Sequence, residues 1–422
     1  MLQAMRNALR IPDLRRRILY TAALLVVFRL GSYVPVPGVD AELLAQQLGT
    51  TGGNIFGFLD LFAGGALTRF SVFAMGVNPY ITASIIVQLL TIVIPSWEEM
   101  SKEGVDGRKR LQQYTRYGTV VLAVIQGFAI TATAKGYGVV SNPGAFNTIL
   151  IVTTLTAGSA FLMWLGEKIT ENGIGNGISL LIFTGIVARL PGQAWSAVRA
   201  VGAGGISILS LLAFVVLTVV VIAGVIMVQQ GQRRIPVQYA KRVVGRRMYG
   251  GQTTHIPMQV NQAGVIPVIF ASSVLSFPLT LAQFIPGIAG INRFLGYGSV
   301  GYNVLYVLLV MFFTYFYTAV TFNPMEVAEN MKKHGGFIPG LRPGRPTAQH
   351  LDRVLTRITL AGAVFLAVIA VLPYIMATVT RMPSSILYFG GTGLLIIVGV
   401  ALDTMKQIEA QLLMRHYEGF IK

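Results

Sequence analysis

The residues that could carry acid–base or ion-coupling chemistry are few, and they avoid the middle of the chain's long apolar segments. A proton-coupled transporter places carboxylates or histidines near the middle of the membrane, and an intramembrane protease needs two aspartates or a serine–histidine pair there. The candidate carboxylates lie in a short apolar segment, at the ends of longer ones or beyond them: Asp60, Glu167, Asp403, Glu326 and Glu329. The four histidines fall in segments that we expect to be cytoplasmic: His255, His334, His350 and His416. These positions disfavour both an ion-coupled mechanism and an intramembrane protease.

A glycine-rich run at residues 173–177 superficially resembles a phosphate-binding loop. No strand is expected before it and no Gly-Lys-Ser/Thr follows it, so the run favours a tight connection between helices. The chain has no cysteine, which excludes disulfides and thiolate metal ligands. We expect no metal, no cofactor and no enzymatic active site, so the energy for any work must come from a partner.

The elements that must position these residues are membrane helices. Of 422 residues, 54% are hydrophobic and only 12% are charged, with a mean hydropathy of +0.65, whereas a soluble domain carries about 25% charged residues. About 20 apolar residues are needed to cross a bilayer as a helix. We therefore predict an all-α polytopic membrane protein with ten transmembrane helices, at residues 18–34, 71–94, 117–134, 146–165, 178–190, 206–228, 263–284, 302–322, 358–379 and 384–402.

Lysine and arginine are distributed unevenly between the two sides of this series of helices. Both termini and the loops 95–116, 229–262 and 323–357 carry most of the 33 cations. The opposite side holds few: Arg69, Lys135, Arg189, Arg199, Arg293 and Arg381. The positive-inside rule places the cation-rich side, with both termini, in the cytoplasm. A net charge of +17 favours anionic partners such as acidic lipids, nucleic acid or acidic protein surfaces.

Residues 55–67 form an apolar stretch that is too short to cross the membrane and lies on the external side. Backbone at membrane depth is tolerated only where it is buried in protein or lines a cavity. The stretch, with Gly64-Gly65 as a possible hinge, favours a short re-entrant helix; a helix lying flat on the outer leaflet is the alternative. Arg29 lies inside the first span near its outer end, where it can snorkel to the external interface or face an aqueous funnel.

Two prolines occupy matching positions in the two halves of the chain. Pro79 lies in the second predicted helix and Pro267 in the seventh, so that each is in the second helix of five. Proline inside a helix removes a backbone hydrogen bond and kinks the helix. Ordinary kinked packing explains either one alone, but the matching positions favour a duplicated five-plus-five architecture of inverted topology.

The basic loops 229–262 and 323–357 are longer than orientation alone requires. The second contains a run rich in glycine and proline at residues 335–344, which predicts a hairpin-like turn. Orientation charge combined with binding of anionic lipids is one interpretation of these loops. Their length favours a docking surface for a large partner.

Several motifs occur in a recognisable order over essentially the whole chain. They are RLGSYVPVPG (29–38), NPYITASI (78–85), QYTRYG (113–118), GIGNGIS (173–179), GQRR (231–234), AGVIP (263–267) and FIPGLRPG (337–344). With them the chain resembles the SecY family, the channel subunits of the bacterial protein translocase. The resemblance implies an hourglass pore between two pseudo-symmetric inverted halves, 1–191 and 207–422, joined by an external hinge at 192–206. It also implies a passive channel that moves unfolded or nascent secretory polypeptides across the cytoplasmic membrane and releases membrane proteins sideways into lipid.

The resemblance assigns residues to the pore. The family's pore waist is a ring of apolar side chains, which dewets and blocks ions, and the matching positions here are Ile81, Ile85, Ile186, Ile269 and Ile396. The family's plug, which seals the channel from outside, matches the short apolar stretch, with Ile55, Phe56, Phe58, Leu59, Asp60, Leu61, Phe62, Gly64, Gly65 and Leu67. The family's lateral gate opens between the second and third helices and the seventh and eighth, with Pro79, Gln88, Gln126, Pro267 and Phe277.

The resemblance also assigns partners. The two long basic loops would dock the SecA motor ATPase or the ribosome, through Arg233, Arg234, Lys241, Arg242, Arg246, Arg247, Arg342, Pro343 and Gly344. Further expected partners are the small subunits SecE and SecG, signal sequences, nascent polypeptides and anionic lipids, but not DNA. Two other functions compete with a protein-conducting channel. A secondary transporter of small solutes is disfavoured by the lack of mid-membrane carboxylates, and a scramblase or insertase without a pore would need neither plug nor ring.

Overall fold

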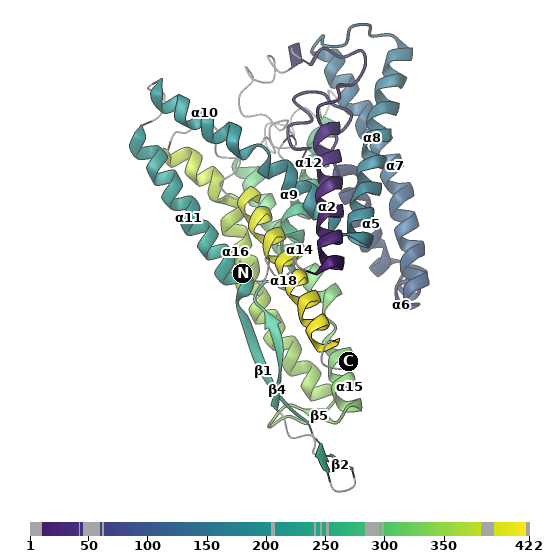
Figure 1. Ribbon diagram of the computed structural model, residues 1–422, viewed down its shortest axis with the longest axis vertical. Coiled ribbons are helices and arrows are strands. Elements are labelled where there is room, and N and C mark those ends of the chain that lie inside the picture. Colours follow the sequence, from purple (N-terminus) through teal and green to yellow (C-terminus); the bar gives the residue numbers. More distant parts are fainter. Residues whose placement is uncertain are drawn as a thin grey trace.

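The computed structural model describes residues 11–41, 43–44, 60, 63–203, 207–239, 242–244, 247–249, 253–282, 296, 299–380 and 392–418. The first half contains α2 (Pro12–Gly31), α5 (Asn78–Val93), α6 (Pro95–Lys102), α7 (Val105–Gly136), α8 (Ala145–Asn172), α9 (Gly177–Val187) and α10 (Leu190–Gly202). The second half contains α11 (Ile208–Gln230), α12 (Ile266–Ala282), α14 (Val300–Thr321), α15 (Pro324–Lys333), α16 (Arg345–Thr380) and α18 (Leu394–Glu418). Figure 1 shows these helices as one elongated bundle.

The helices agree with the predicted membrane spans in position. Within the described residues, six helical segments are long and apolar enough to cross a membrane, and the pair α5–α6, bent by 102°, is a seventh candidate. The most apolar of them is α11, whose mean hydropathy reaches 3.2 and whose surface is mostly uncovered by the rest of the chain. Each predicted span overlaps a helix in its described residues, so a predominantly helical membrane protein is confirmed, whereas the count of ten crossing helices stays a prediction.

The prediction that Pro79 and Pro267 kink their helices is wrong. Pro79 lies in the first turn of α5 and Pro267 in the first turn of α12. A proline in the first turn replaces an amide that has no partner within the helix, so it starts a helix without bending it. The sharp bend lies instead at Ile94, where α5 gives way to α6.

The segment before α5 is not helical, although the predicted span begins at residue 71. It forms successive turns in which Phe70 and Gly76 have positive φ angles of 42° and 58°. The chain pairs with the end of α2 here, because Val36 donates to the Phe70 carbonyl at 3.0 Å and Val72 donates to the Val34 carbonyl at 2.9 Å. These bonds fix residues 70–72 beside the C-terminal end of α2.

The two halves contact each other through corresponding helices. On one side α12 packs against α5 and α7, and on the other α18 packs against α9. The second helices of the two halves therefore meet, and so do the fifth, as expected for two related halves facing each other. One large apolar core runs through both halves and includes residues of α5, α9, α12 and α18.

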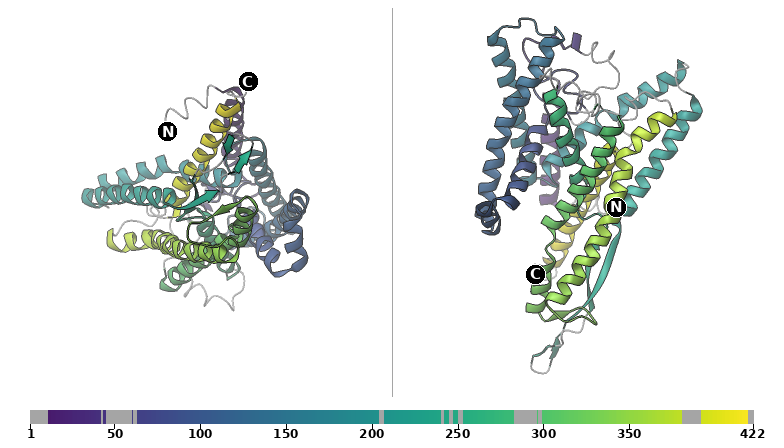
Figure 2. Two further views of the ribbon diagram at one scale, coloured as in Figure 1. Left: turned by 90° about the horizontal axis from the view of Figure 1, so that it is seen from below. Right: turned by 180° about the vertical axis from the view of Figure 1, so that it is seen from behind.

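A small sheet at one end of the bundle was not predicted (Figures 1 and 2). Strand β1 (Gln232–Tyr239) pairs antiparallel with β4 (Thr253–Gln259) and also with β5 (Gly336–Phe337), while β2 (Arg242–Val244) pairs with β3 (Arg247–Tyr249). Alternation in β1 buries Ile235 and Val237 in a separate core with Met258, Met331, Ile338, Leu351 and Leu355. Since β1 and β5 come from different basic loops, the sheet joins the two loops into one body.

Candidate channel site

The five isoleucines proposed for the pore ring all lie in the core that joins the two halves. Each is at most 5% exposed, and all belong to the same apolar cluster: Ile81, Ile85, Ile186, Ile269 and Ile396. The first two are one turn apart on α5 and share a face of that helix. The others come from α9, α12 and α18, the helices through which the halves meet. The structure thus buries all five in the core between the halves, and their function as a ring stays a prediction.

A cavity of about 470 Å³ lies beside this cluster, between helices of both halves. Ile81 and Ile269 form part of its wall, together with the gate candidate Gln88. The rest of the lining includes polar side chains, among them Gln112, Glu167, Glu171, Asn176 and Ser179. The wall is therefore mixed, with polar and apolar side chains, and the cavity is large enough and polar enough to hold water.

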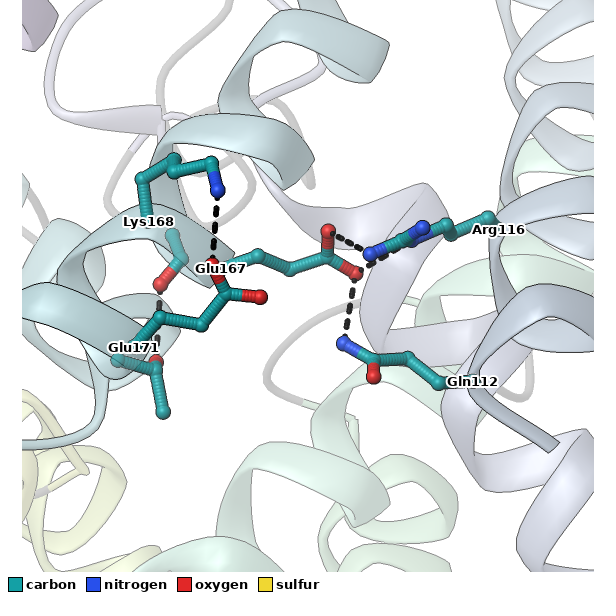
Figure 3. Close-up of polar contacts among 7 residues, drawn as sticks. Gln112, Arg116, Glu167, Lys168 and Glu171 are labelled. Atoms are coloured by element: carbon teal, nitrogen blue, oxygen red, sulfur yellow. Dashed lines mark hydrogen bonds and ion pairs between the residues drawn. The ribbon is translucent and has the colours of Figure 1, made fainter. Parts of the chain in front are cut away.

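Glu167, a candidate for coupling chemistry, is occupied by structural contacts in the wall of this cavity (Figure 3). Its side chain is 8% exposed and forms an ion pair with Arg116, with Nη2 2.8 Å from Oε2 and Nε donating to Oε1 at 2.9 Å. Gln112 donates to the same Oε1 at 3.1 Å. A buried carboxylate is stable only when paired and hydrogen-bonded in this way. Glu167 therefore holds α7 against α8.

The described part of the predicted plug segment is buried in the protein. Asp60, Ala63, Ala66 and Leu67 are all buried, and a Cβ built on Gly64 would lie 2.7 Å from the Cα of Gly185 in α9. Gly185 directly precedes the ring candidate Ile186, so the segment touches α9 at the level of the ring. This burial favours the re-entrant arrangement over a helix lying flat on the membrane. The other proposed plug residues lie outside the described residues: Ile55, Phe56, Phe58, Leu59, Leu61 and Phe62.

Asp60 is the polar centre of this segment. Its Oδ1 accepts hydrogen bonds from the amides of Leu67 at 2.9 Å and Thr68 at 3.2 Å, and its Oδ2 accepts from the Thr68 hydroxyl at 3.1 Å. Arg189, just after α9, forms an ion pair with Asp60, with Nη1 2.8 Å from Oδ2. Gly64 and Gly65, with φ angles of 67° and 90°, allow the tight turn around this carboxylate.

Arg29, at the end of α2, contacts the same segment. Its Nη1 donates to the Gly64 carbonyl at 2.9 Å, and its Nη2 donates to the Tyr33 hydroxyl at 3.1 Å. Tyr33 also lies under Arg69, whose guanidinium carbon is 4.2 Å from the ring centroid. The two interpretations of Arg29 from the sequence were snorkelling to the interface and facing an aqueous funnel. Neither interpretation included a contact with the plug segment.

The gate candidates lie on helices that pack against each other across the two halves. Pro79 and Gln88 belong to α5, Gln126 to α7 and Pro267 to α12, and α12 contacts both α5 and α7. Gln88 faces the cavity and Gln126 is half-buried. Phe277 belongs to α12, but its side chain lies outside the described part of the chain.

The docking candidates are placed on the body that the sheet forms. Arg233 and Arg234 are exposed on β1, and Arg342 and Pro343 are exposed in the turn before α16. Gly344, with a φ angle of 103°, ends this turn. Arg242 and Arg247 lie in β2 and β3, whereas Lys241 and Arg246 fall outside the described residues. Because β5 pairs with β1, the three-stranded sheet joins the two predicted docking loops, whereas β2 and β3 form a separate two-stranded sheet.

Comparisons with known sequences agree over the whole chain. A family model described as SecY matches residues 71–405. The protein translocase subunit SecY of Mycobacterium tuberculosis (strain ATCC 25618 / H37Rv) is 48% identical over 451 residues, with 100% of both chains covered. The protein translocase subunit SecY of Thermotoga maritima is 49% identical over 431 residues, with 100% of this chain and 98% of that one covered. These relatives give no support to a solute transporter.

Comparisons with solved structures agree on the fold. A structure described as "The structure of a protein conducting channel" has a TM-score of 0.65 at 18% identity, covering 93% of this chain and 91% of that one. A second structure has a TM-score of 0.63 at 18% identity, covering 93% of this chain and 91% of that one. It is described as "The plug domain of the SecY protein stablizes the closed state of the translocation channel and maintains a membrane seal". Sec61 in a canine ribosome–channel complex has a TM-score of 0.62, also at 18% identity and with the same coverage.

Proposed function

The chain belongs to the SecY family, and from that premise we propose that it is a passive protein-conducting channel. Its substrates are unfolded or nascent secretory polypeptides, which cross the cytoplasmic membrane through the centre of the bundle. The observation that carries this proposal is that five isoleucines from both halves are buried in the core that joins the halves, where Ile81 and Ile269 also line a cavity with polar and apolar walls. An apolar collar of this kind blocks ions by dewetting, and its β-branched side chains can fit closely around a passing chain.

The decisive experiment is site-specific photo-crosslinking to a secretory polypeptide stalled during translocation. A photoreactive amino acid at Ile81 or Ile269 is expected to crosslink to the stalled chain, because both positions face the proposed pore. The matched control is Ile86, which lies on the same helix α5 but is 43% exposed on the surface of the bundle. Equal crosslinking from Ile81 and Ile86, or none from either proposed ring position while the chain is demonstrably stalled, contradicts a central pore.

The same channel would release hydrophobic segments into the membrane through a gate between α5 and α7 on one side and α12 and α14 on the other. The support for this gate is that α12 packs against α5 and α7 without being covalently joined to them nearby. Opening there would let a signal sequence partition between the pore and lipid according to its hydrophobicity. Gln88 on α5 and Gln126 on α7 are polar residues on the side of the gate formed by the first half, and they would set how readily the gate opens.

We assign the sheet-bearing end to the cytoplasm, with both chain termini, in a multi-pass protein of the bacterial inner membrane. This end carries many cations, and the pairing of β1 with β5 joins its two basic loops. Both features support docking of the SecA motor or of the ribosome, with anionic lipids at the periphery. SecE and SecG are the proposed small subunits of the assembly. Among the structural neighbours, Sec61 is described in a ribosome–channel complex, which makes the ribosome the better supported of the large partners.

Charge reversal at Arg342 is expected to reduce motor-driven export about tenfold, because a reversed charge on a docking surface slows the encounter with an acidic partner. Assembly with the small subunits, measured by co-purification, should stay normal. The control is Arg108→Glu, which reverses an exposed arginine on α7, outside the two proposed docking loops. If Arg342→Glu lowers export and assembly equally, or if Arg108→Glu lowers export as much, the docking assignment fails.

A further inference from the structure

We propose that Arg29 and Arg189 form a latch that holds the plug segment against α9. The latch would set how strong the signal sequence of an exported polypeptide must be to displace the segment. This inference rests on the proposed function, because it takes the residues around Asp60 as the plug. Arg189 binds the Asp60 side chain and Arg29 binds the Gly64 carbonyl, so two guanidinium groups hold one turn at two points. The two arginines come from different elements, the end of α2 and the turn after α9.

The first part of the latch is an ion pair with unequal burial. The Asp60 side chain is 1% exposed and that of Arg189 is 25% exposed. A carboxylate buried to this extent stays charged at low cost only while a cation and hydrogen-bond donors surround it. When the segment is displaced, Asp60 regains water and needs no partner. Arg189 therefore stabilises the seated segment relative to the displaced one.

The second part of the latch is the bond from Arg29 to the Gly64 carbonyl, 2.9 Å long. Gly64 is the residue that touches Gly185 next to the ring candidate Ile186. A guanidinium group donating to a backbone carbonyl makes a charge-assisted hydrogen bond, which is stronger than a neutral one. Arg29 thus fixes the contact between the segment and α9 from the side of the first helix.

A purely structural function of Asp60 is the competing explanation. Its three hydrogen bonds to Leu67 and Thr68 close the turn, and an asparagine could keep the two bonds to the backbone amides. If closing the turn were the only function of Asp60, the effects of removing Arg189 and of removing the Asp60 charge would be independent of each other. If the ion pair acts as a latch, removing either partner removes the same interaction, and the two changes cannot add.

Arg189→Gln is expected to raise ion flux through the resting channel in liposomes about tenfold, within the range that coupled pairs show, and to allow export of a reporter with a weakened signal sequence. Asp60→Asn should act in the same direction but less, because it leaves no buried charge. Adding Asp60→Asn to Arg189→Gln should bring no further increase and should lower the flux toward that of Asp60→Asn alone. Arg189→Lys should keep the seal, and Arg29→Gln should raise the flux less than Arg189→Gln.

The matched control is Arg199→Gln on α10, since Arg199 is another cation of the external side and contacts Trp195. It should leave the flux and the export threshold unchanged. Additive effects of Arg189→Gln and Asp60→Asn, or a loss of thermal stability in Arg189→Gln without any change in flux, overturn the latch. Failure of the unmodified protein to export any reporter contradicts the proposed function instead, so the two failures are distinguishable.

Discussion

Replacing both Ile81 and Ile269 with threonine is expected to let ions through the resting channel, whereas replacing both with valine is expected to leave it sealed. Threonine and valine have nearly the same shape and the same branching at Cβ, so the comparison isolates polarity. Both isoleucines are buried in the cluster where the halves meet and form part of the cavity wall. A constriction that excludes ions by dewetting fails once hydroxyl groups hydrate it.

The size of the effect follows from the hydration of the two hydroxyl groups. Each is worth about 1–3 kcal/mol relative to an apolar group, and about 1.4 kcal/mol corresponds to tenfold. Ion flux through purified channel in liposomes should therefore rise at least about tenfold in the threonine variant. The valine variant should lose about 0.5–1.5 kcal/mol of stability at each site without leaking. Equal flux in the two variants would show that packing, and not polarity, makes the seal, and would remove Ile81 and Ile269 from the ring.

Most of the helical architecture could be predicted from the sequence, because the signals are local. Runs of about 20 apolar residues place α11 and α14 within two residues of their observed ends, and the distribution of cations around them predicts an orientation. The errors occurred where local composition is ambiguous. Residues 71–77 are apolar enough to continue α5 but form turns, since Gly76 adopts a positive φ angle and packs against Ala63.

Contacts between remote parts of the chain could not be predicted in this way. The pairing of β1 with β5 joins two loops separated by α12 and α14, and no periodicity in either loop indicates its partner. In the sequence, Asp60 stands out as a carboxylate in an apolar stretch and Arg189 as one of the few cations predicted on the external side. The two were not predicted to form the ion pair seen in the structure. The scarcity of charge on that side was the available signal, because an isolated buried carboxylate requires a cation.

The site was predictable only through the resemblance. An isoleucine in a membrane helix has no signature of its own, so Ile186 and Ile396 look like any other core residues in the sequence. The structure adds that α9 and α18 pack together across the two halves and that both isoleucines are buried in the core between them. Burial there agrees with the ring assignment, but neighbouring core residues share it, so only the resemblance singles these positions out.

Gly64→Ala is expected to unseat the plug segment, while Gly65→Ala should leave it seated. Both glycines have positive φ angles, 67° and 90°, so alanine costs about 1–2 kcal/mol at either position. They differ in their surroundings. A Cβ at Gly64 would lie 2.7 Å from the Cα of Gly185, whereas a Cβ at Gly65 would be 4.0 Å from Nε of Arg189. The backbone of α9 cannot yield as a side chain can, so overpacking adds about 1–3 kcal/mol at Gly64 alone.

The absence of cysteine from the chain allows a direct measurement of this displacement. Ala66→Cys places a unique thiol near the C-terminal end of the plug segment, at a position that is 0% exposed. Labelling by a membrane-impermeant maleimide from the external side should be about tenfold faster with Gly64→Ala than with Gly65→Ala, since the extra 1–3 kcal/mol raises the population of the displaced segment by that order. Equal labelling of the two would mean that backbone strain, not the contact with Gly185, holds the segment. Faster labelling with a matching fall in the thermal stability of the whole bundle would instead indicate general unfolding, because displacement of the plug alone leaves the packing of α5, α9, α12 and α18 intact.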